Sequence, residues 1–224
     1  MNDSYEVADQ KTIKDRLRNI STSFFNNERR LLVCDLDDVL VNITCKWAKL
    51  AVKKYNLDPI LAEEKTVIDR SEYYVESLLG INKEQFMHIY RDEKFYDDLI
   101  PTKLGIAVAK STHDMNIDLV IISHLTEENI VGKRRFCEKF FPKARHILVP
   151  HTVKKSSVIN KEGLDYCTFI DDRAENIEDV VLNTQSFGKE FMLPKFGHNQ
   201  EISRGALLNI HENSSKLTFY ENVL

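Results

Sequence analysis

The fold of this chain is decided by one stretch, Arg30-Leu31-Leu32-Val33-Cys34-Asp35-Leu36-Asp37-Asp38-Val39-Leu40. Its apolar run is too short for an ordinary helix and is typical of a buried strand. Such a strand would deliver the three carboxylates to its carboxyl edge, where open α/β sheets bind ligands. Burying like charges so close together is costly unless a cation neutralises them, so the stretch predicts a hard divalent metal, first of all Mg²⁺. The alternative is an exposed acidic turn.

Composition places the chain among ordinary globular proteins. Its 224 residues are 42% hydrophobic and 29% charged, which allows one buried core and an added subdomain. The formal net charge of −4 speaks against a general nucleic-acid or anionic-membrane surface. No apolar run approaches the roughly 20 residues that span a bilayer, and the first residues lack the pattern of a signal peptide. We therefore expect a cytoplasmic protein without a membrane partner, whose scattered cysteines are free thiols.

Apolar periodicity divides the rest of the chain into alternating helices and strands. Residues 1–29 carry apolar side chains at helical spacing and predict a leading helix. Residues 44–99 show helical patterns, including a capping box at Asn82. Helices are also expected at 103–112, at 127–141 and after Lys154, and further apolar strands at 117–123, 146–149, 166–170 and 187–193. This alternation predicts an α/β fold, a doubly wound parallel sheet with helices on both faces.

The insert after the first strand is longer than a crossover requires. Asp38 and Ser123 are 85 positions apart, whereas a direct crossover between parallel strands takes about a dozen residues. We therefore expect residues 44–99 to form a helical cap on a core made of 30–43 and 100–200. Residues 1–29 would be an N-terminal extension, and 201–224 a C-terminal segment without an assigned role.

Polar residues follow the expected strands and one helix start. The first strand ends in carboxylates, the second in Ser123 and a later one in Asp171-Asp172, while Lys155 lies near the start of a helix. Because carboxyl ends of parallel strands meet at one edge, we expect these groups at a single site. Phosphoryl transfer to an aspartate needs such a set: a nucleophile, a metal, donors for the phosphate oxygens and a second acid.

The set resembles the four motifs of the haloacid dehalogenase superfamily of phosphohydrolases. Its first motif is similar to Asp35-Leu36-Asp37-Asp38-Val39, its second to Ser123, its third to Lys155 and its fourth to Asp171-Asp172. The resemblance implies that Asp35 is the nucleophile, that Asp37 is the acid and base, and that Ser123 and Lys155 bind the phosphate. It implies that Mg²⁺ is held by Asp35, the backbone carbonyl of Asp37 and Asp172, with Asp171 acting through a bound water. Lys154 and Lys161 stay open as alternatives to Lys155.

The insert resembles the type-one cap of this superfamily, and in detail the 5′(3′)-deoxyribonucleotidases. Tyr73-Tyr74-Val75 is similar to the aromatic pair that holds the nucleobase there, and Arg173 would hold base or phosphate. His124, a further substrate-binding residue, stands where that family has a small hydroxyl, and Ile43 where it has a phenylalanine beside the base. Asp38 stands where that family usually has glycine. Tyr73 and Tyr74 could equally be cap core residues, and Arg173 could form a surface salt bridge.

The leading hypothesis is a Mg²⁺-dependent phosphatase that forms an aspartyl phosphate and acts on deoxyribonucleoside monophosphates. A phosphatase for sugar phosphates or for polynucleotide 3′ ends would use the same core residues. The run Lys133-Arg134-Arg135 could supply the basic groove that a polynucleotide needs, although such a run is usually a solvated face and the net charge makes a nucleic-acid partner the weaker choice. A non-catalytic binding module would be expected to lack one of the carboxylates, all of which are present.

Overall fold

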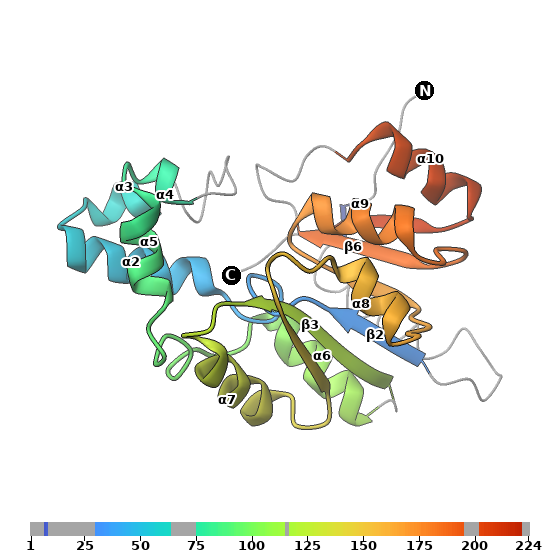
Figure 1. Ribbon diagram of the computed structural model, residues 1–224, viewed down its shortest axis with the longest axis horizontal. Helices are drawn as coiled ribbons and strands as arrows, with labels where there is room; N and C mark the ends of the chain where they lie inside the picture. Colours follow the sequence, from blue (N-terminus) through green and yellow to red (C-terminus); the bar gives the residue numbers. More distant parts are fainter. Residues whose placement is uncertain (1–6, 9–29, 64–74, 115–116, 195–201, 221–224) are drawn as a thin grey trace.

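The computed structural model describes residues 7–8, 30–63, 75–114, 117–194 and 202–220, and its centre is a parallel sheet (Figure 1). In these residues the strand order is β1-β7-β6-β5-β2-β3-β4, and every neighbouring pair runs parallel. The predicted doubly wound sheet is therefore confirmed. The strands are β1 (Val7–Ala8), β2 (Arg30–Cys34), β3 (Ile117–Leu125), β4 (Arg145–Pro150), β5 (Thr168–Ile170), β6 (Glu190–Pro194) and β7 (Lys216–Tyr220).

Residues 30–34, which lie directly before the three carboxylates, form an inner strand of the sheet, β2. β2 lies between β3 and β5, with Cys34 paired to Ile121 on one side and to Ile170 on the other. The backbone N–H of Asp35 donates to the carbonyl of Ile170 at 2.8 Å. The carboxylates after β2 and those after β5 therefore start from the same edge of the sheet.

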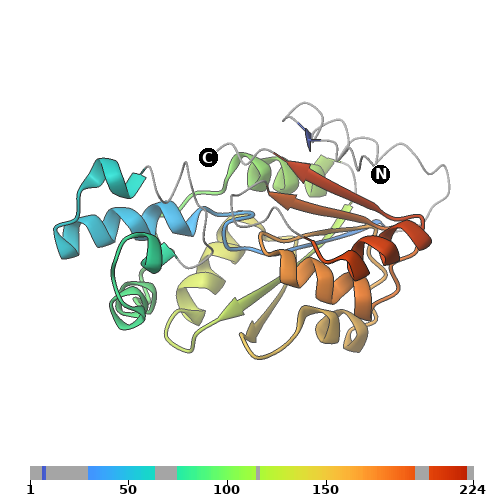
Figure 2. The same cartoon turned by 90° about the horizontal axis from the view of Figure 1, so that it is seen from above.

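Helices cover both faces of the sheet. Alternate residues of β2 point to opposite faces, and each face is apolar and packs against its own set of helices. Leu32 and Cys34 belong to a core with α6 and α7, whereas Val33 belongs to a second core with α8, α9 and α10. Figure 2 shows α6 (green) on one side of the sheet and α9 and α10 (orange to red) on the other. These helices are α6 (Lys103–Asp114), α7 (Ile130–Phe140), α8 (Lys155–Lys161), α9 (Ala174–Asn183) and α10 (Arg204–Glu212).

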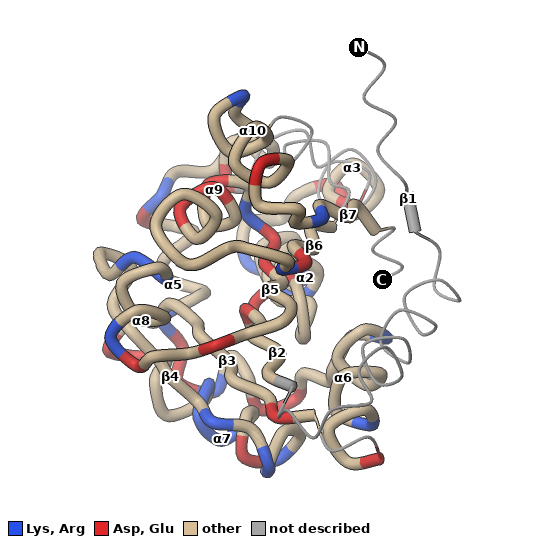
Figure 3. The backbone as a smooth tube through the Cα atoms, turned by 90° about the vertical axis from the view of Figure 1, so that its right-hand side faces the viewer, with Lys and Arg blue, Asp and Glu red and all other residues tan. Residues whose placement is uncertain are grey.

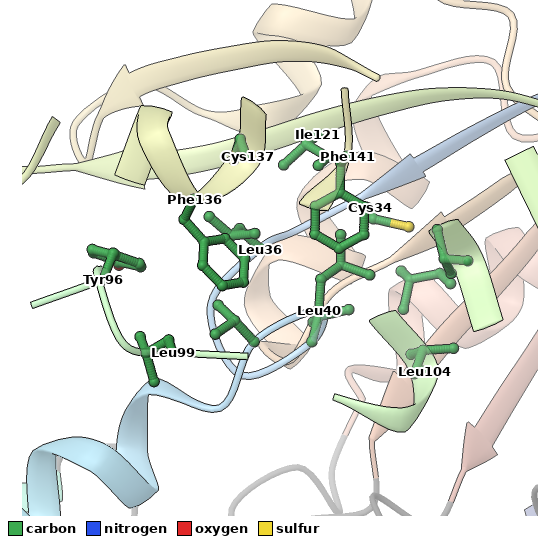
Figure 4. Packing of buried hydrophobic residues seen from close by; sticks show 14 of the residues in the cluster. Cys34, Leu36, Leu40, Tyr96, Leu99, Leu104, Ile121, Phe136, Cys137 and Phe141 are labelled. Atoms are coloured by element: carbon green, nitrogen blue, oxygen red, sulfur yellow. The ribbon is translucent and has the colours of Figure 1, made fainter. Parts of the chain in front are cut away.

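The loop that follows β2 is itself part of the core. Figure 4 shows Leu36 and Leu40 in one cluster of buried side chains with Phe136 of α7 and with Phe141, which follows that helix. The backbone N–H of Leu40 donates to the carbonyl of Leu36 at 2.8 Å. Asp38 has a left-handed backbone with φ of 56°, a region that glycine adopts freely and that Asp tolerates better than most residues. A backbone of this kind accounts for an Asp where the resembled family has glycine.

The insert is helical in the described residues and lies to one side of the sheet (Figure 1). Asn82 and Gln85 form the predicted capping box, with both reciprocal hydrogen bonds present. The chain enters and leaves the insert side by side, because Val41 pairs with Pro101 in an antiparallel bridge. The insert helices are α2 (Ile43–Tyr55), α3 (Pro59–Glu63), α4 (Val75–Leu78) and α5 (Lys83–Tyr90).

Both ends of the chain differ from the expected pattern. In the region expected to be a leading helix, Val7 and Ala8 form β1 against β7, and residues 1–6 and 9–29 lie outside the described part. The segment after residue 200 contains α10 and β7, and β7 extends the sheet beside β6. The last predicted strand begins later than expected, at Glu190, because Phe187 is 72% exposed in a turn with Gly188 at φ of 65°.

Two further expectations concern thiols and membranes. The four cysteines are free thiols, as predicted, and two of them, Cys34 and Cys137, are buried. Within the described ranges, we find no helix with the length and apolar character needed to cross a bilayer.

Candidate active site

A cleft of about 320 Å³ opens at the carboxyl edge of the sheet, between the core and the insert. Asp35, Asp37, Ser123 and Asp172 reach it from the core, so the structure brings together residues from three of the four motifs. Helices α2, α4 and α5 supply the opposite wall. The other lining residues are Asp38, Ile43, Thr44, Trp47, Glu76, Lys83, Phe86, Met87, Tyr90, His124, Leu125, Thr126, His151, Arg173 and Asn176.

Asp35 is buried and paired with the lysine of the third motif. Lys155 Nζ lies 2.8 Å from Asp35 Oδ1 and 2.6 Å from Asp171 Oδ2. Burial raises the pKa of Asp35, but the charge and hydrogen bond of Lys155, together with the charge of Lys133, outweigh burial, and the net shift is downward. The pKa of Asp171 is raised by burial and by Asp35, against the opposing charge of Lys155. Asp35 is thus held ionised, as a nucleophile must be.

Asp37 is surrounded by a different set of donors. Lys133 Nζ lies 2.7 Å from its Oδ2, and the Tyr90 hydroxyl donates to the same oxygen at 3.1 Å. The Tyr96 hydroxyl donates to Oδ1 at 2.8 Å. Burial nevertheless raises the pKa of Asp37, and the neighbouring charge of Asp35 adds to the rise against the opposing effect of Lys133. The two carboxylates of the first motif therefore have pKa values shifted in opposite directions, the pattern of a base or nucleophile beside an acid.

Three carboxylates lie close enough together to hold a metal ion. One oxygen each from Asp35, Asp171 and Asp172 fall within 4.8 Å of one another, and all three residues are buried. Asp35 Oδ1 is a buried oxygen that accepts no well-aligned hydrogen bond from the described residues, although Lys155 lies near it. An all-carboxylate set with such an oxygen fits a hard divalent cation.

Asp171 also accepts hydrogen bonds from protein groups that the sequence did not indicate as its partners. Its Oδ1 accepts hydrogen bonds from the backbone N–H of Arg173 at 3.0 Å and from Asn176 Nδ2 at 2.9 Å, and its Oδ2 faces Lys155. Both oxygens of Asp171 are thus engaged by protein donors. Asp172 lines the cleft directly.

The position of the site lysine was open between three residues, and the geometry separates them. Lys155 is buried between Asp35 and Asp171. Lys154 is 70% exposed and pairs with Asp179 at 3.3 Å, and Lys161 is exposed in the last turn of α8. Only Lys155 of the three contacts the carboxylates of the cleft.

The predicted substrate-binding residues have different positions. His124 lines the cleft, and its Nε2 lies 3.0 Å from the carbonyl oxygen of Val153. Arg173 also lines the cleft, with its Nε 3.5 Å from Glu175. Tyr73 and Tyr74 lie outside the described residues. The described part of the insert instead brings other aromatic rings to the cleft, with Trp47 and Phe86 4.7 Å apart between centroids.

The expectation that Lys133-Arg134-Arg135 is a solvated face was wrong for its first member. Lys133 is 0% exposed. Arg134 is exposed, and Arg135 contacts Glu93 and Asp97, so acidic positions lie beside α7 (Figure 3). A signal was present in the sequence, because Lys133 precedes the buried pair Phe136-Cys137 by three and four residues and so shares their face of the helix.

Comparisons with known proteins give likenesses of structure only. No family model matches the sequence, and neither does any curated protein. A protein assigned as a haloacid dehalogenase-like hydrolase from Bacteroides fragilis has 13% identity and a TM-score of 0.49, covering 88% of this chain and 98% of that one. An L-2-haloacid dehalogenase from Xanthobacter autotrophicus has 9% identity and a TM-score of 0.46, covering 84% of each chain.

A third likeness is to a protein assigned as a β-phosphoglucomutase from Thermotoga maritima, with 14% identity and a TM-score of 0.43, covering 85% of this chain and 94% of that one. The solved structures to which this chain is similar thus include haloacid dehalogenase-like hydrolases, the superfamily whose four motifs its sequence resembles.

Proposed function

We propose that this chain is a phosphomonoester hydrolase in which Asp35 is the nucleophile and Asp37 the acid and base. One observation carries the proposal. Two carboxylates face the same cleft in opposite electrostatic settings: Lys155 lowers the pKa of Asp35, whereas burial and the charge of Asp35 raise the pKa of Asp37. A nucleophile that ionises readily, beside a second carboxyl group that takes up a proton more readily, is the arrangement that ester cleavage requires.

In the first step a carboxylate oxygen of Asp35 forms a bond to phosphorus while the bond from phosphorus to the ester oxygen breaks. The proton of Asp37 moves to that ester oxygen, and the alcohol leaves. In the second step Asp37 accepts a proton from water, whose oxygen attacks the aspartyl phosphate. The bond from phosphorus to Asp35 breaks, and inorganic phosphate is released. Ser123, which lines the cleft, and Lys155, whose Nζ lies 2.8 Å from Asp35 Oδ1, would donate to the phosphate oxygens.

Mg²⁺ is the cofactor that this site fits. Asp35 and Asp172 would hold it, with the backbone carbonyl of Asp37. Asp171 would contribute through Lys155 and a bound water rather than directly, since both its oxygens accept from protein donors. When bound, the ion offsets the repulsion between the carboxylates and the phosphate.

Asp37 also favours an ester substrate over a halide. A halide ion is a weak base and leaves without a proton, whereas an alkoxide needs one as its bond to phosphorus breaks. A dehalogenase would therefore gain nothing from an acid at this position. The donors around Asp37, from Lys133, Tyr90 and Tyr96, indicate a carboxyl group with a specific place in the reaction.

For the substrate class we propose deoxyribonucleoside monophosphates. The wall opposite the carboxylates includes Ile43, Trp47, Phe86 and Met87, an apolar surface suited to the flat face of a nucleobase. Arg173 and His124 also line the cleft and offer polar contacts to the rest of the nucleotide. A sugar phosphate would find fewer partners on such a wall.

The test is phosphate release from deoxyribo- and ribonucleoside monophosphates, hexose phosphates and a 3′-phosphorylated oligonucleotide. Each substrate is assayed with Mg²⁺, with chelator, and with Asp35→Asn as the control variant. We expect metal-dependent turnover that is fastest on deoxyribonucleotides and absent in the variant. Turnover that favours hexose phosphates or oligonucleotides would refute the substrate class, and turnover that survives Asp35→Asn would refute the nucleophile.

A further inference from the structure

Lys133 is a fully buried cation beside the site, and it belongs to none of the four motifs. Its Nζ contacts three acceptors: Asp37 Oδ2 at 2.7 Å, Ser123 Oγ at 3.2 Å and the carbonyl oxygen of His124. Burial alone would lower its pKa, but the neighbouring acidic groups, Asp37 first among them, together outweigh burial and the net shift is upward. The side chain is therefore a buried ammonium group with its charge balanced by Asp37.

The number of acceptors decides what Lys133 can bind. An ammonium group has three N–H donors, and the three acceptors use all of them. Lys155 differs, because its described contacts are the two carboxylates of Asp35 and Asp171, which leaves one donor for a substrate. Lys133 therefore has no N–H donor left for a substrate, whereas Lys155 has one that a phosphate oxygen could accept.

The other donors to Asp37 come from α5 of the insert and from residues 91–102, the returning segment that joins α5 to α6. Tyr90 is the last residue of α5, and Tyr96 lies in the returning segment, which packs on α7. Gly132 permits this packing, since a Cβ at that position would lie 2.2 Å from the backbone oxygen of Glu93. Arg135 adds an ion pair with Asp97 at 2.8 Å.

We propose that Lys133 is a positioning residue that, with Tyr90 and Tyr96, fixes the carboxyl group of Asp37 for proton transfer to the leaving oxygen. The inference rests on the proposed function and deepens it, because it couples the acid to the docking of the returning segment on α7. Lys133 acts through Asp37 and does not contact the substrate. Its removal should therefore slow only those steps that need the proton of Asp37.

The leaving group provides the decisive test. An aryl oxide leaves without help from an acid, whereas an alkoxide needs a proton. We would compare 4-nitrophenyl phosphate with deoxyribonucleoside 5′-monophosphates for wild type, Lys133→Met and Asp37→Asn. We expect Lys133→Met to lower kcat on the nucleotide by roughly a hundredfold, in the range of acid catalysis, and on the aryl ester by less than about tenfold. Arg134→Met, the neighbouring exposed position on α7, is the matched control and should change neither rate.

A double variant tests whether Lys133 works through Asp37. If it does, Lys133→Met should have little further effect on nucleotide turnover once Asp37→Asn is present, because interacting sites are not additive. Equal losses on both esters, or losses that multiply in the double variant, would overturn the proposal, since they would indicate that Lys133 binds phosphate or supports the fold alone.

Stability is measured in parallel, because a buried charge loses its partner in Lys133→Met. If that variant is unfolded at the assay temperature, Tyr96→Phe decides, since it removes one hydroxyl and keeps the ring. A loss of roughly tenfold confined to the nucleotide supports the proposal, and an equal loss on both esters or no loss overturns it. Absence of turnover by wild type would overturn the proposed function as well, whereas turnover with equal losses overturns only the role of Lys133.

Discussion

The close approach of α7 to the returning segment makes Gly132→Ala a sharp perturbation of this protein. A Cβ added there would lie 2.2 Å from the backbone oxygen of Glu93, where real Cβ contacts essentially never fall below 3.0 Å. The segment must therefore move by at least about 0.8 Å or α7 must tilt. The nearest side-chain atom, the Tyr96 Cβ, is 3.7 Å from the added carbon, so the displaced segment includes a donor to Asp37.

The expected loss of stability follows from two opposing terms. Overpacking of this kind costs about 1–3 kcal/mol, whereas replacing a helical glycine gains up to about 1 kcal/mol of helix propensity. The net loss should be about 1–2 kcal/mol, which for a chain of this size lowers Tm by roughly 2–8 °C. Gly205→Ala is the matched control, because Gly205 also lies in the first turn of a helix and has nothing within 4 Å of its Cβ position.

Urea unfolding of the two variants beside wild type measures the difference. We expect Gly132→Ala to be less stable than wild type and Gly205→Ala to be equal or more stable. Nucleotide turnover should fall only in Gly132→Ala, since only that change displaces Tyr96. A gain of stability in both variants would refute the reasoning, because it would mean that a Cβ at position 132 does not collide with the returning segment.

Three further outcomes follow from the site and its loop. Asp38→Ala should lower the free energy of unfolding by about 2–3 kcal/mol, because it places alanine at φ of 56° and removes the acceptor of the Thr44 N–H. In the same urea titration Asp38→Gly should recover part of this loss, and equal stability of wild type and both variants would contradict the prediction. Mg²⁺ at a hundred times its Kd should add about 2.7 kcal/mol of stability, seen as a higher Tm that Asp172→Asn abolishes; a shift that persists in this variant would exclude Asp172 as a ligand. Lys155→Met should lower stability by about 3–5 kcal/mol, because it leaves the buried carboxylates of Asp35 and Asp171 without their counter-charge, whereas the exposed Lys154→Met should cost less than about 1 kcal/mol.

Much of this protein was predictable because the signals are local. A strand of five residues followed by carboxylates, the alternation of strands with helices, and the capping box at Asn82 each depend on residues near one another in the sequence. The position of Asp35 and Asp171 at one edge of the sheet followed from parallel pairing alone, and the pairing of Cys34 with Ile170 bears it out. The C-terminal strand β7 was missed because Lys216 and Thr218 interrupt its apolar residues, and its burial depends on the neighbouring β6.

The partners of the carboxylates were decided only by the tertiary structure. Lys133 meets Asp37 across 96 positions of sequence, and Tyr96 meets it across 59. The local pattern places Lys133 on the buried face of α7, but its contact with Asp37 depends on where that helix lies beside the loop after β2, and the contact of Tyr96 depends on how the returning segment lies against α7. The sequence by itself determined which side chains gather at the edge of the sheet. Only the packing decided that one lysine is buried against Asp35 and another against Asp37, because burial and charge pairing are properties of the assembled core.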